Sequence, residues 1–457
     1  MKELTQRIFR AYDIRGIVDR DFDEEWVERL GRACGTYFLR RGIDAAVVGY
    51  DCRESSPSYH NALVRGLLAT GVDVTSIGMV PTPVLYFAVK HLGRKAGVMI
   101  TASHNPSAYN GFKVWAGETT IHGEEIAALW ELFRDGVFAT GNGVGCEHDI
   151  VPSYLDAITT RVQLARPLKV VVDGGNGAGG LVCAEMLRRL GAEVVELYCE
   201  PDGRFPNHHP DPVVEENVTD LKARVQAEGA DLGVALDGDA DRIGAVDTAG
   251  RLLCGDELLA LYARELLARK PGSLVIGDVK CSQRLFDDIR AHGGEPMMWI
   301  TGHSVIKARM QETGAPLAGE LSGHMFFEDR WYGFDDAIYG AARLLELLAK
   351  QEAPLASLPG WPPVASTREV HIACPDEHKF AVIRRAQQWF KERFSVNDID
   401  GARVQFEDGW GLVRASNTQP VLVLRFEAST HEKLAALREC METPIKAWIA
   451  EAAEAGA

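Results

Sequence analysis

The segment Lys169-Val170-Val171-Val172-Asp173 is an apolar run that ends in an aspartate, and a glycine-rich loop and a helical stretch follow it. Residues 45–51 and residues 274–278 repeat this order of apolar run, loop and helical stretch. The first two helical stretches end at Gly71 and Gly191, and another β-type run follows each glycine. Strands and helices that alternate in this way form parallel or mixed sheets covered by helices. The three repeats therefore predict three α/β domains.

A final segment with a different pattern follows the breaker-rich residues 354–363. Its sequence predicts a strand over residues 368–373, a helix over residues 379–394, two or three strands up to Phe426 and a closing helix from Thr430. This order is typical of an α+β domain.

The length of 457 residues is too great for a single hydrophobic core and predicts several domains. We expect three related mixed-sheet α/β domains and a C-terminal α+β domain around a central cleft. The predicted bounds are 1–151, 152–252, 253–364 and 365–457.

The composition of 46% apolar and 25% charged residues is that of an ordinary globular protein. No stretch of about 18 uncharged apolar residues occurs, and residues 1–7 lack the apolar region of a signal peptide. We therefore expect a cytoplasmic protein with no membrane partner. The nine cysteines include no Cys-x-x-Cys pair, which indicates free thiols rather than a disulfide framework.

The formal charge of −16 disfavours nucleic acid as a partner, because Lys and Arg provide most contacts to a phosphate backbone. An anionic substrate would need a local concentration of positive charge in a cleft. Salt screens the repulsion from the distant surface beyond about 10 Å, so local cations can still attract a phosphate.

The segment Thr101-Ala102-Ser103-His104-Asn105-Pro106 places a serine hydroxyl where the apolar run of residues 96–100 becomes a turn. Ser103 is a candidate nucleophile. A serine alcohol is weakly nucleophilic, so covalent chemistry requires a neighbouring base, a metal or prior loading with a phosphoryl group. A simple turn before Pro106, which Ser and Asn also favour, is the alternative.

Three carboxylates alternate in Asp237-Gly238-Asp239-Ala240-Asp241-Arg242, between two apolar runs. Crowded hard oxygen ligands suit Mg²⁺ or Ca²⁺ and repel one another without a cation. An EF-hand loop would need Gly at its sixth position and Glu at its twelfth, where this chain has Arg242 and Thr248. The pattern therefore indicates a metal site other than an EF-hand, with a solvated acidic turn as the alternative.

Two more motifs follow the serine and acidic segments along the chain. They are Gly319-Glu320-Leu321-Ser322-Gly323-His324 and, after it, Arg414-Ala415-Ser416-Asn417-Thr418. Together the four segments resemble the four active-site motifs of the α-D-phosphohexomutase superfamily, particularly its bacterial phosphomannomutase/phosphoglucomutase branch. The resemblance extends from Phe9 to about Phe426. Each motif is only moderately specific, but four in order are a strong signal.

The resemblance implies reversible phosphoryl transfer between O1 and O6 of mannose and/or glucose phosphates, through a phosphoserine and a 1,6-bisphosphate that reorients. It implies that Ser103 carries the phosphate and that Ser103, Asp237, Asp239 and Asp241 hold Mg²⁺. Such a transfer needs positive charge around the phosphoryl oxygens. Glucose or mannose 1,6-bisphosphate would be activator and intermediate, a hexose phosphate the substrate, and the protein a monomer.

Further site residues follow from the same resemblance. Glu320 and Ser322 would bind ring hydroxyls at positions 3 and 4, which both orientations of the sugar present. The anchor for the non-reacting phosphate would consist of Arg414, Ser416, Asn417 and Thr418. The residues that would line the rest of the cleft are Tyr12, Arg15, Lys113, Arg242, Lys280, His303 and His324.

Among these, Lys113 and His303 are the candidates for general base and acid, because each attacking sugar hydroxyl must lose a proton. His104 would steady the phosphate on its neighbour Ser103. Ordinary surface or capping roles are the alternative for each of these single residues. Because one motif lies in each domain, the reacting groups must converge, and rotation of the last domain could admit substrate.

Three other functions stay open. Leu321 resembles the mannose/glucose branch, but a phosphoglucosamine mutase is an alternative. Residues 175–180 satisfy G-x-G-x-x-G after a strand, with Glu196 further on, as in an NAD-dependent oxidoreductase. That reading leaves the serine and acidic motifs unexplained. A non-catalytic sugar-phosphate binding protein would need neither the nucleophile nor the metal.

Overall fold

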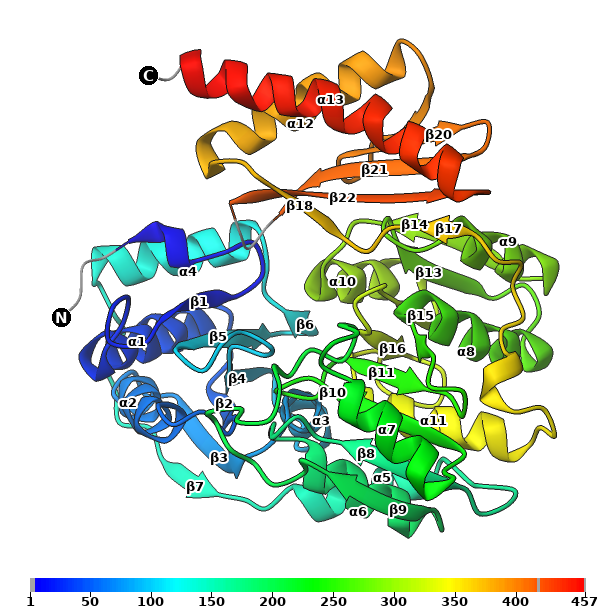
Figure 1. Cartoon of the computed structure of the whole chain (residues 1–457). Coiled ribbons are helices and arrows are strands. Elements are labelled where there is room, and N and C mark those ends of the chain that lie inside the picture. Colours follow the sequence, from blue (N-terminus) through cyan, green and yellow to red (C-terminus); the bar gives the residue numbers. More distant parts are fainter. Residues whose placement is uncertain (1–4, 417–419, 456–457) are drawn as a thin grey trace.

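The structure is a computed structural model that describes residues 5–416 and 420–455. Four sheets follow one another along the chain (Figure 1). The first has the order β1-β5-β4-β2-β3-β7, with β6 on β5. Its strands are β1 (Ile14–Ile17), β2 (Ala45–Tyr50), β3 (Asp73–Met79), β4 (Ala96–Ile100), β5 (Tyr109–Ala116), β6 (Thr119–Thr120) and β7 (Gly145–Glu147).

Helices cover both faces of this sheet because alternate strand residues point in opposite directions. Val47 belongs to the apolar cluster of α3 (Thr82–His91), whereas Ala46 and Val48 belong to the cluster of the other helices. Those helices are α1 (Glu24–Arg40), α2 (Ser56–Leu68) and α4 (Glu124–Asp135). The predicted β-α-β repeat is confirmed here, with β2 and β3 parallel on either side of α2.

The second sheet has the order β12-β11-β10-β8-β9. Its strands are β8 (Lys169–Asp173), β9 (Glu193–Leu197), β10 (Leu232–Leu236), β11 (Ile243–Val246) and β12 (Leu252–Leu253). Its helices are α5 (Val151–Thr159), α6 (Gly180–Arg189) and α7 (Thr219–Glu228). The parallel pair of β8 and β9 around α6 is the second predicted repeat.

The third sheet has the order β14-β13-β15-β16. Its strands are β13 (Leu274–Asp278), β14 (Glu295–Trp299), β15 (Leu317–Gly319) and β16 (Met325–Phe327). Its helices are α8 (Gly255–Arg269), α9 (Gln283–Ala291), α10 (His303–Thr313) and α11 (Ala337–Ala349). The parallel pair of β13 and β14 around α9 is the third repeat, so the predicted fold class is confirmed for these three sheets.

The C-terminal sheet is antiparallel, in the order β17-β22-β21-β20-β19 with β18 on β22. Its strands are β17 (Ala365–Ser366), β18 (Val370–Ala373), β19 (Ser395–Asn397), β20 (Ala402–Phe406), β21 (Gly409–Ala415) and β22 (Val421–Ala428). The helices α12 (Asp376–Lys391) and α13 (His431–Ala455) cover one face of it (Figure 1). The predicted α+β character is confirmed.

Several details of this last domain differ from the prediction. The strand β17 was not predicted, β18 begins at Val370 rather than at residue 368, and α12 ends at Lys391 rather than at residue 394. The helix α12 begins at Asp376 rather than Lys379, because the extended Pro375 precedes its first turn. Four strands, rather than two or three, lie between α12 and α13, because β19 is too short to show an alternating pattern. None of the helices within the described residues is long and apolar enough to cross a membrane.

The four predicted domain bounds stay a prediction, although each sheet and its helices occupy one continuous part of the chain.

Candidate active site

Three of the four motifs lie in turns between antiparallel strands. The serine loop, residues 101–106, joins β4 to β5. The acidic loop, residues 237–242, joins β10 to β11. The sugar loop, residues 320–324, joins β15 to β16. Of the fourth motif, Arg414 and Ala415 are the last residues of β21 and Ser416 follows them. The three related sheets therefore present their motifs on the same structural element.

The nucleophile candidate Ser103 is buried and contacts the acidic loop directly. Its Oγ donates a hydrogen bond to Asp237 Oδ2 at 2.6 Å and lies 3.1 Å from His104 Nδ1. Its backbone is in the left-handed region, with φ of 50°, which is unfavourable for a residue with a Cβ. Such strain persists only where the surroundings hold it, and it is common at functional sites.

Arg53 holds the serine loop in this conformation, and the sequence analysis did not identify it. The side chain is 1% exposed and its Nε donates to Asp51 Oδ2 at 3.1 Å. It also donates to four main-chain carbonyl oxygens, those of Ser103 at 2.7 Å, Asn105 at 2.6 Å, Pro106 at 2.8 Å and Tyr109 at 2.9 Å. Arg53 therefore uses the full fork of a guanidinium to fix the loop. In the sequence it looks like an ordinary loop arginine.

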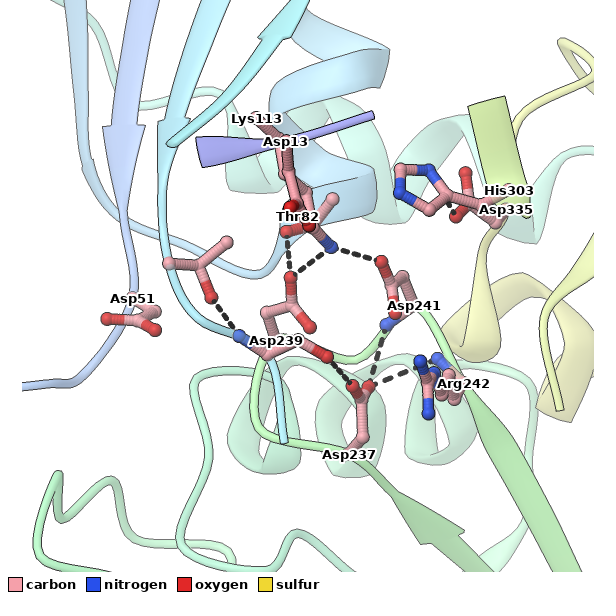
Figure 2. A network of polar contacts seen from close by, with 12 residues as sticks. Asp13, Asp51, Thr82, Lys113, Asp237, Asp239, Asp241, Arg242, His303 and Asp335 are labelled. Atoms are coloured by element: carbon pink, nitrogen blue, oxygen red, sulfur yellow. Dashed lines mark hydrogen bonds and ion pairs between the residues drawn. The ribbon is translucent and has the colours of Figure 1, made fainter. Parts of the chain in front are cut away.

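The three aspartates of the acidic loop are buried, and one carboxylate oxygen from each lies within 4.8 Å of the others (Figure 2). Asp237 Oδ1 accepts the backbone N–H groups of Asp241 and Arg242, both at 3.1 Å. Asp239 Oδ2 accepts from Thr82 Oγ1 at 2.5 Å. The turn thus aims its alternate side chains at one point.

The cluster fits a hard cation. Lys113 Nζ donates to Asp239 Oδ2 at 2.6 Å and also contacts Asp241 Oδ2. The other oxygen of each of these two carboxylates is buried and has no hydrogen-bond partner among the residues that the structure describes. Buried oxygens without donors are costly, and Mg²⁺ takes carboxylate oxygens as ligands. The predicted metal residues are therefore brought together in a form that suits Mg²⁺.

Charge and burial shift the pKa values of this cluster in opposite directions. Burial and the charges of Asp239 and Asp241 raise the pKa of Asp237 well above its ordinary value. Burial would also raise the pKa of Asp239, but Lys113 and the Thr82 hydroxyl hold it lower. Burial opposes the charge of Lys113, yet the two aspartates raise its pKa. Lys113 is therefore a cation here, and acting as a general base would require these contacts to change.

Two histidines lie on the other side of the acidic loop. Arg242 Nε donates to His324 Nε2 at 2.9 Å, which leaves the ring proton on Nδ1. That nitrogen lies 3.0 Å from Asp335 Oδ2 and 3.6 Å from Asp241 Oδ1. The rings of His303 and His324 stack at 5.5 Å. The predicted residues Arg242, His303 and His324 are thus contiguous with the metal cluster.

Asp335 and Lys307, which the sequence analysis missed, support these histidines. Lys307 Nζ donates to Asp335 Oδ1 at 2.8 Å and lies 3.3 Å from His303 Nδ1. Burial, and then the charge of Lys307, lowers the pKa of His303 well below its ordinary value. Because the Lys307 ammonium faces Nδ1, the ring proton of the neutral His303 lies on Nε2. Asp335 precedes the helix cap Asp336 of α11, so in the sequence it resembles an ordinary capping residue.

The predicted sugar loop is next to His303. The carboxylate of Glu320 is buried, and it accepts from the Gly302 N–H at 2.6 Å and from Ser322 Oγ at 2.9 Å. Tyr12 packs edge-on against the His303 ring, with centroids 5.1 Å apart. Tyr12 therefore joins the first domain to the third at this point.

The remaining cationic residues have carboxylate partners. Arg15 Nη1 donates to Asn105 Oδ1 of the serine loop at 2.9 Å and its Nε to Asp13. Lys280 Nζ donates to Glu369 Oε1 at 2.7 Å, and Arg414 Nε to Asp400 Oδ2 at 2.9 Å. Burial opposes the charge of Lys280 and Arg414, but nearby carboxylates raise both pKa values. Ser416 is buried, and Asn417 and Thr418 lie outside the described residues.

Comparison with known proteins agrees with this geometry along the whole chain. Family models described as phosphoglucomutase/phosphomannomutase match it in four parts: alpha/beta/alpha domain I at residues 6–139, domain II at 152–250, domain III at 254–361 and the C-terminal domain at 369–443. A phosphomannomutase/phosphoglucomutase of Pseudomonas aeruginosa is 48% identical over 448 residues, which are 97% of this chain and 96% of that protein.

Two further proteins extend the comparison. A phosphoglucomutase of Neisseria gonorrhoeae is 46% identical over 435 residues, 94% of this chain and 95% of the other. A crystal structure of a phosphoglucomutase/phosphomannomutase family protein from Burkholderia thailandensis superimposes with a TM-score of 0.92 at 44% identity, covering 98% of each chain.

Proposed function

The chain belongs to the phosphoglucomutase/phosphomannomutase family, and from this premise we infer that it catalyses reversible phosphoryl transfer between O1 and O6 of hexose phosphates. It is an isomerase of the phosphomannomutase/phosphoglucomutase type. The contact of 2.6 Å between Ser103 Oγ and Asp237 Oδ2 supports this function most directly. It unites the predicted nucleophile with the predicted metal loop, from two different sheets.

Ser103 is the proposed site of phosphorylation. In the first half-reaction the P–Oγ bond breaks, a P–O bond to the sugar hydroxyl forms, and the hydroxyl proton passes to a base. The resulting 1,6-bisphosphate turns over, and its other phosphoryl group moves to Ser103 Oγ with return of a proton to the leaving sugar oxygen. His104, 3.1 Å from Ser103 Oγ, is placed to donate a hydrogen bond to that phosphate through its ring N–H.

Asp237, Asp239, Asp241 and an oxygen of phosphorylated Ser103 would hold Mg²⁺. When bound, this ion supplies positive charge to the phosphoryl oxygens and to the bridging oxygen, where negative charge develops. Thr82 and Lys113 hold the Asp239 carboxylate in place from the opposite side.

His303 and His324 are the residues best placed to move protons. His303 is neutral because burial and Lys307 lower its pKa, and its Nε2 has no hydrogen-bond partner within the described part of the chain. Asp335 orients the His324 ring and Arg242 fixes its tautomer. The predicted roles of Lys113 and His303 as general base and acid stay part of this proposal, with Lys113 acting after its contacts to the aspartates are loosened.

The sugar would be recognised midway between its two reactive ends. Glu320 and Ser322 already share a hydrogen bond, so together they can accept and donate to two adjacent ring hydroxyls. Arg414 and Ser416, with Asn417 and Thr418, are the proposed anchor for the non-reacting phosphate, and Tyr12, Arg15 and Lys280 line the space between. In the described structure Arg414 donates to Asp400 and Lys280 donates to Glu369. A bound phosphate would take the place of these two carboxylates.

We further propose a monomeric cytoplasmic enzyme with domains 1–151, 152–252, 253–364 and 365–457, and with glucose or mannose 1,6-bisphosphate as activator. The preferred sugar is mannose or glucose, and glucosamine phosphate is the alternative substrate.

Mass spectrometry and coupled assays would test this function. After treatment with glucose 1,6-bisphosphate, the intact protein should carry one stable phosphoryl adduct, and peptide mapping should locate it on Ser103. Parallel assays with mannose 1-phosphate, glucose 1-phosphate and glucosamine 1-phosphate would rank the substrates. Absence of an adduct together with absence of turnover on all three sugars would leave a binding protein.

A further inference from the structure

The glycine-rich residues 174–180 have no part in the catalysis described above, although they satisfy a dinucleotide-binding motif. They connect β8 to α6 and lie directly behind the acidic loop. The N–H of Ala178 donates to the carbonyl oxygen of Gly238 at 2.9 Å. This packing places the glycine-rich loop against the backbone that carries the three aspartates.

Only part of this loop needs glycine for its backbone conformation. Gly175 has φ of 54°, in the left-handed region. Gly179 has φ of −96° and ψ of −13°, which any residue can adopt, and Gly177 is not among the glycines with positive φ. At Gly177 and Gly179 the requirement for glycine must therefore come from a lack of space for a side chain rather than from the backbone conformation.

The space is filled by the acidic loop itself. A Cβ on Gly177 would lie 2.7 Å from the carbonyl oxygen of Gly238 and 2.9 Å from its Cα. A Cβ on Gly179 would lie 2.3 Å from the Cβ of Ala240. Separations below 3.0 Å force something to move. Ala240 stands between Asp239 and Asp241, so a displacement there shifts two of the three carboxylates.

The same close packing of backbones extends to Ser103, the proposed nucleophile. A Cβ on Gly238 would lie 2.5 Å from the carbonyl oxygen of Ser103, the atom to which Arg53 Nη2 donates at 2.7 Å. The glycine-rich loop, the acidic loop and the serine loop thus lie backbone against backbone. Their separation is fixed by the absence of side chains at the glycines between them.

We propose that Gly177 and Gly179 are positioning residues of the phosphoryl-transfer reaction. Because they lack side chains, they set the distance between the three aspartates and Ser103. This inference rests on the proposed role of the acidic loop as the Mg²⁺ site. It explains the glycines by close packing rather than by a pyrophosphate. It also accounts for Gly179, which stands at a position that the motif G-x-G-x-x-G leaves free.

The test is a rescue experiment. Gly179→Ala should lower kcat/KM by about 10²-fold, because displacements of about 1 Å at reacting groups have effects of that order. It should also raise the Mg²⁺ concentration needed for half-maximal activity. Ala240→Gly removes the Cβ that a new side chain would meet and relieves a positive φ of 56°. The double variant Gly179→Ala/Ala240→Gly should therefore recover most of both losses.

Gly177→Ala provides the matched contrast. Its Cβ would meet the backbone of Gly238, so Ala240→Gly should not rescue it. Gly340→Ala is the control, because the atoms nearest to its Cβ lie at 3.7 Å, on Ile243 and Tyr262, and belong to none of the three loops. It should leave kcat/KM and the Mg²⁺ requirement unchanged.

Thermal midpoints and circular dichroism would accompany each assay. If Gly179→Ala does not fold, recovery of folded, Mg²⁺-dependent enzyme in the double variant decides the question. A double variant as impaired as Gly179→Ala, or a Gly179→Ala enzyme that behaves like Gly340→Ala, would overturn the inference. A wild-type enzyme that turns over without Mg²⁺ would instead contradict the proposed metal site.

Discussion

The two sides of the candidate active site are held together in different ways. On the side of the first two sheets, the serine and acidic loops are joined by buried hydrogen bonds between distant parts of the chain. Ser103 contacts Asp237, Thr82 contacts Asp239, and Lys113 contacts Asp239 and Asp241. These partners are all buried, so water does not compete for them.

The C-terminal domain is attached asymmetrically. Toward the third domain it makes several buried contacts: Arg403 Nη1 donates to the carbonyl oxygen of Cys281 at 2.8 Å, and Glu427 Oε1 accepts from Ser282 Oγ at 3.0 Å. Toward the first two domains, the ion pairs among the described residues are solvent-accessible ones, Arg10 with Asp376 at 3.7 Å and Arg368 with Glu215 at 2.6 Å.

This difference suggests which side is preformed and which side moves. Exposed ion pairs contribute about 0–1 kcal/mol each, so breaking them costs little. We therefore expect the proposed phosphate anchor to approach or leave while the proposed nucleophile and the acidic loop keep their geometry. The predicted rotation of the last domain would use its buried attachment to the third domain as the pivot.

The largest expected effect tests the preformed side. Ser103→Ala should lower kcat by roughly 10³-fold or more, because the only proposed acceptor of the phosphoryl group is lost. The fold should persist, since Arg53 binds the main chain of this loop and not the serine hydroxyl. Coupled assays and circular dichroism would measure both. Turnover near that of the wild type would mean that the nucleophile lies elsewhere.

Asp239→Asn should have the next largest effect on the same side. Loss of one charge from the cluster should reduce kcat on the order of 10²- to 10³-fold and raise the Mg²⁺ requirement, because electrostatic support at the reacting phosphate is lost. A titration of activity with MgCl₂ would measure this. The exposed Asp135→Asn is the control, and equal behaviour of the two variants would remove Asp239 from the metal site.

How far the sequence predicts this site depends on whether a residue's role is visible locally. Ser103 and the three aspartates stand out because turns between apolar strands rarely carry such side chains, and the structure brings them together. The β-α-β repeats were predictable for the same reason, since their strands and helices have local periodicity. These features are properties of short segments.

The residues that were missed act through contacts between distant parts of the chain. Thr82, just after Pro81 and before Pro83, looks like a helix start, and its contact with Asp239 depends on how the first two sheets pack. Arg53 and Lys307 look like loop and helix cations of the kind that is usually exposed. Their burial against loop carbonyls and against Asp335 follows from tertiary structure, which no local pattern encodes.

A smaller effect is expected on the side of the C-terminal domain. Arg414→Ala should lower kcat/KM roughly 10- to 100-fold, mainly through KM, because one charge-assisted contact to the non-reacting phosphate is lost. The buried Arg414 also binds Asp400, so thermal midpoints must be compared. The exposed Arg385→Ala of the same domain is the control. A change in melting alone, with kcat/KM intact, would contradict the anchor role.

The smallest expected effect concerns the anchoring of the preformed side by His208, which lies in the loop before α7. His208 Nε2 lies 3.1 Å from both oxygens of the buried Asp173 carboxylate, at the end of β8. Burial opposes the charged imidazole, but the bond to Asp173 raises the pKa of His208 above 6.5, with a further contribution from Asp220. The charged form is therefore favoured in the folded protein.

A pKa that is higher in the folded state makes stability depend on pH in one direction. The contribution of His208 is complete below its unfolded pKa of 6.5 and is lost as pH rises through the folded pKa. A shift of one unit corresponds to about 1.4 kcal/mol, so the effect is modest. The thermal midpoint of His208→Gln should fall below that of the wild type near pH 6 and approach it near pH 9, whereas the exposed His148→Gln should show no such trend. A constant difference across this range would show that the imidazole anchors the loop by packing rather than by charge.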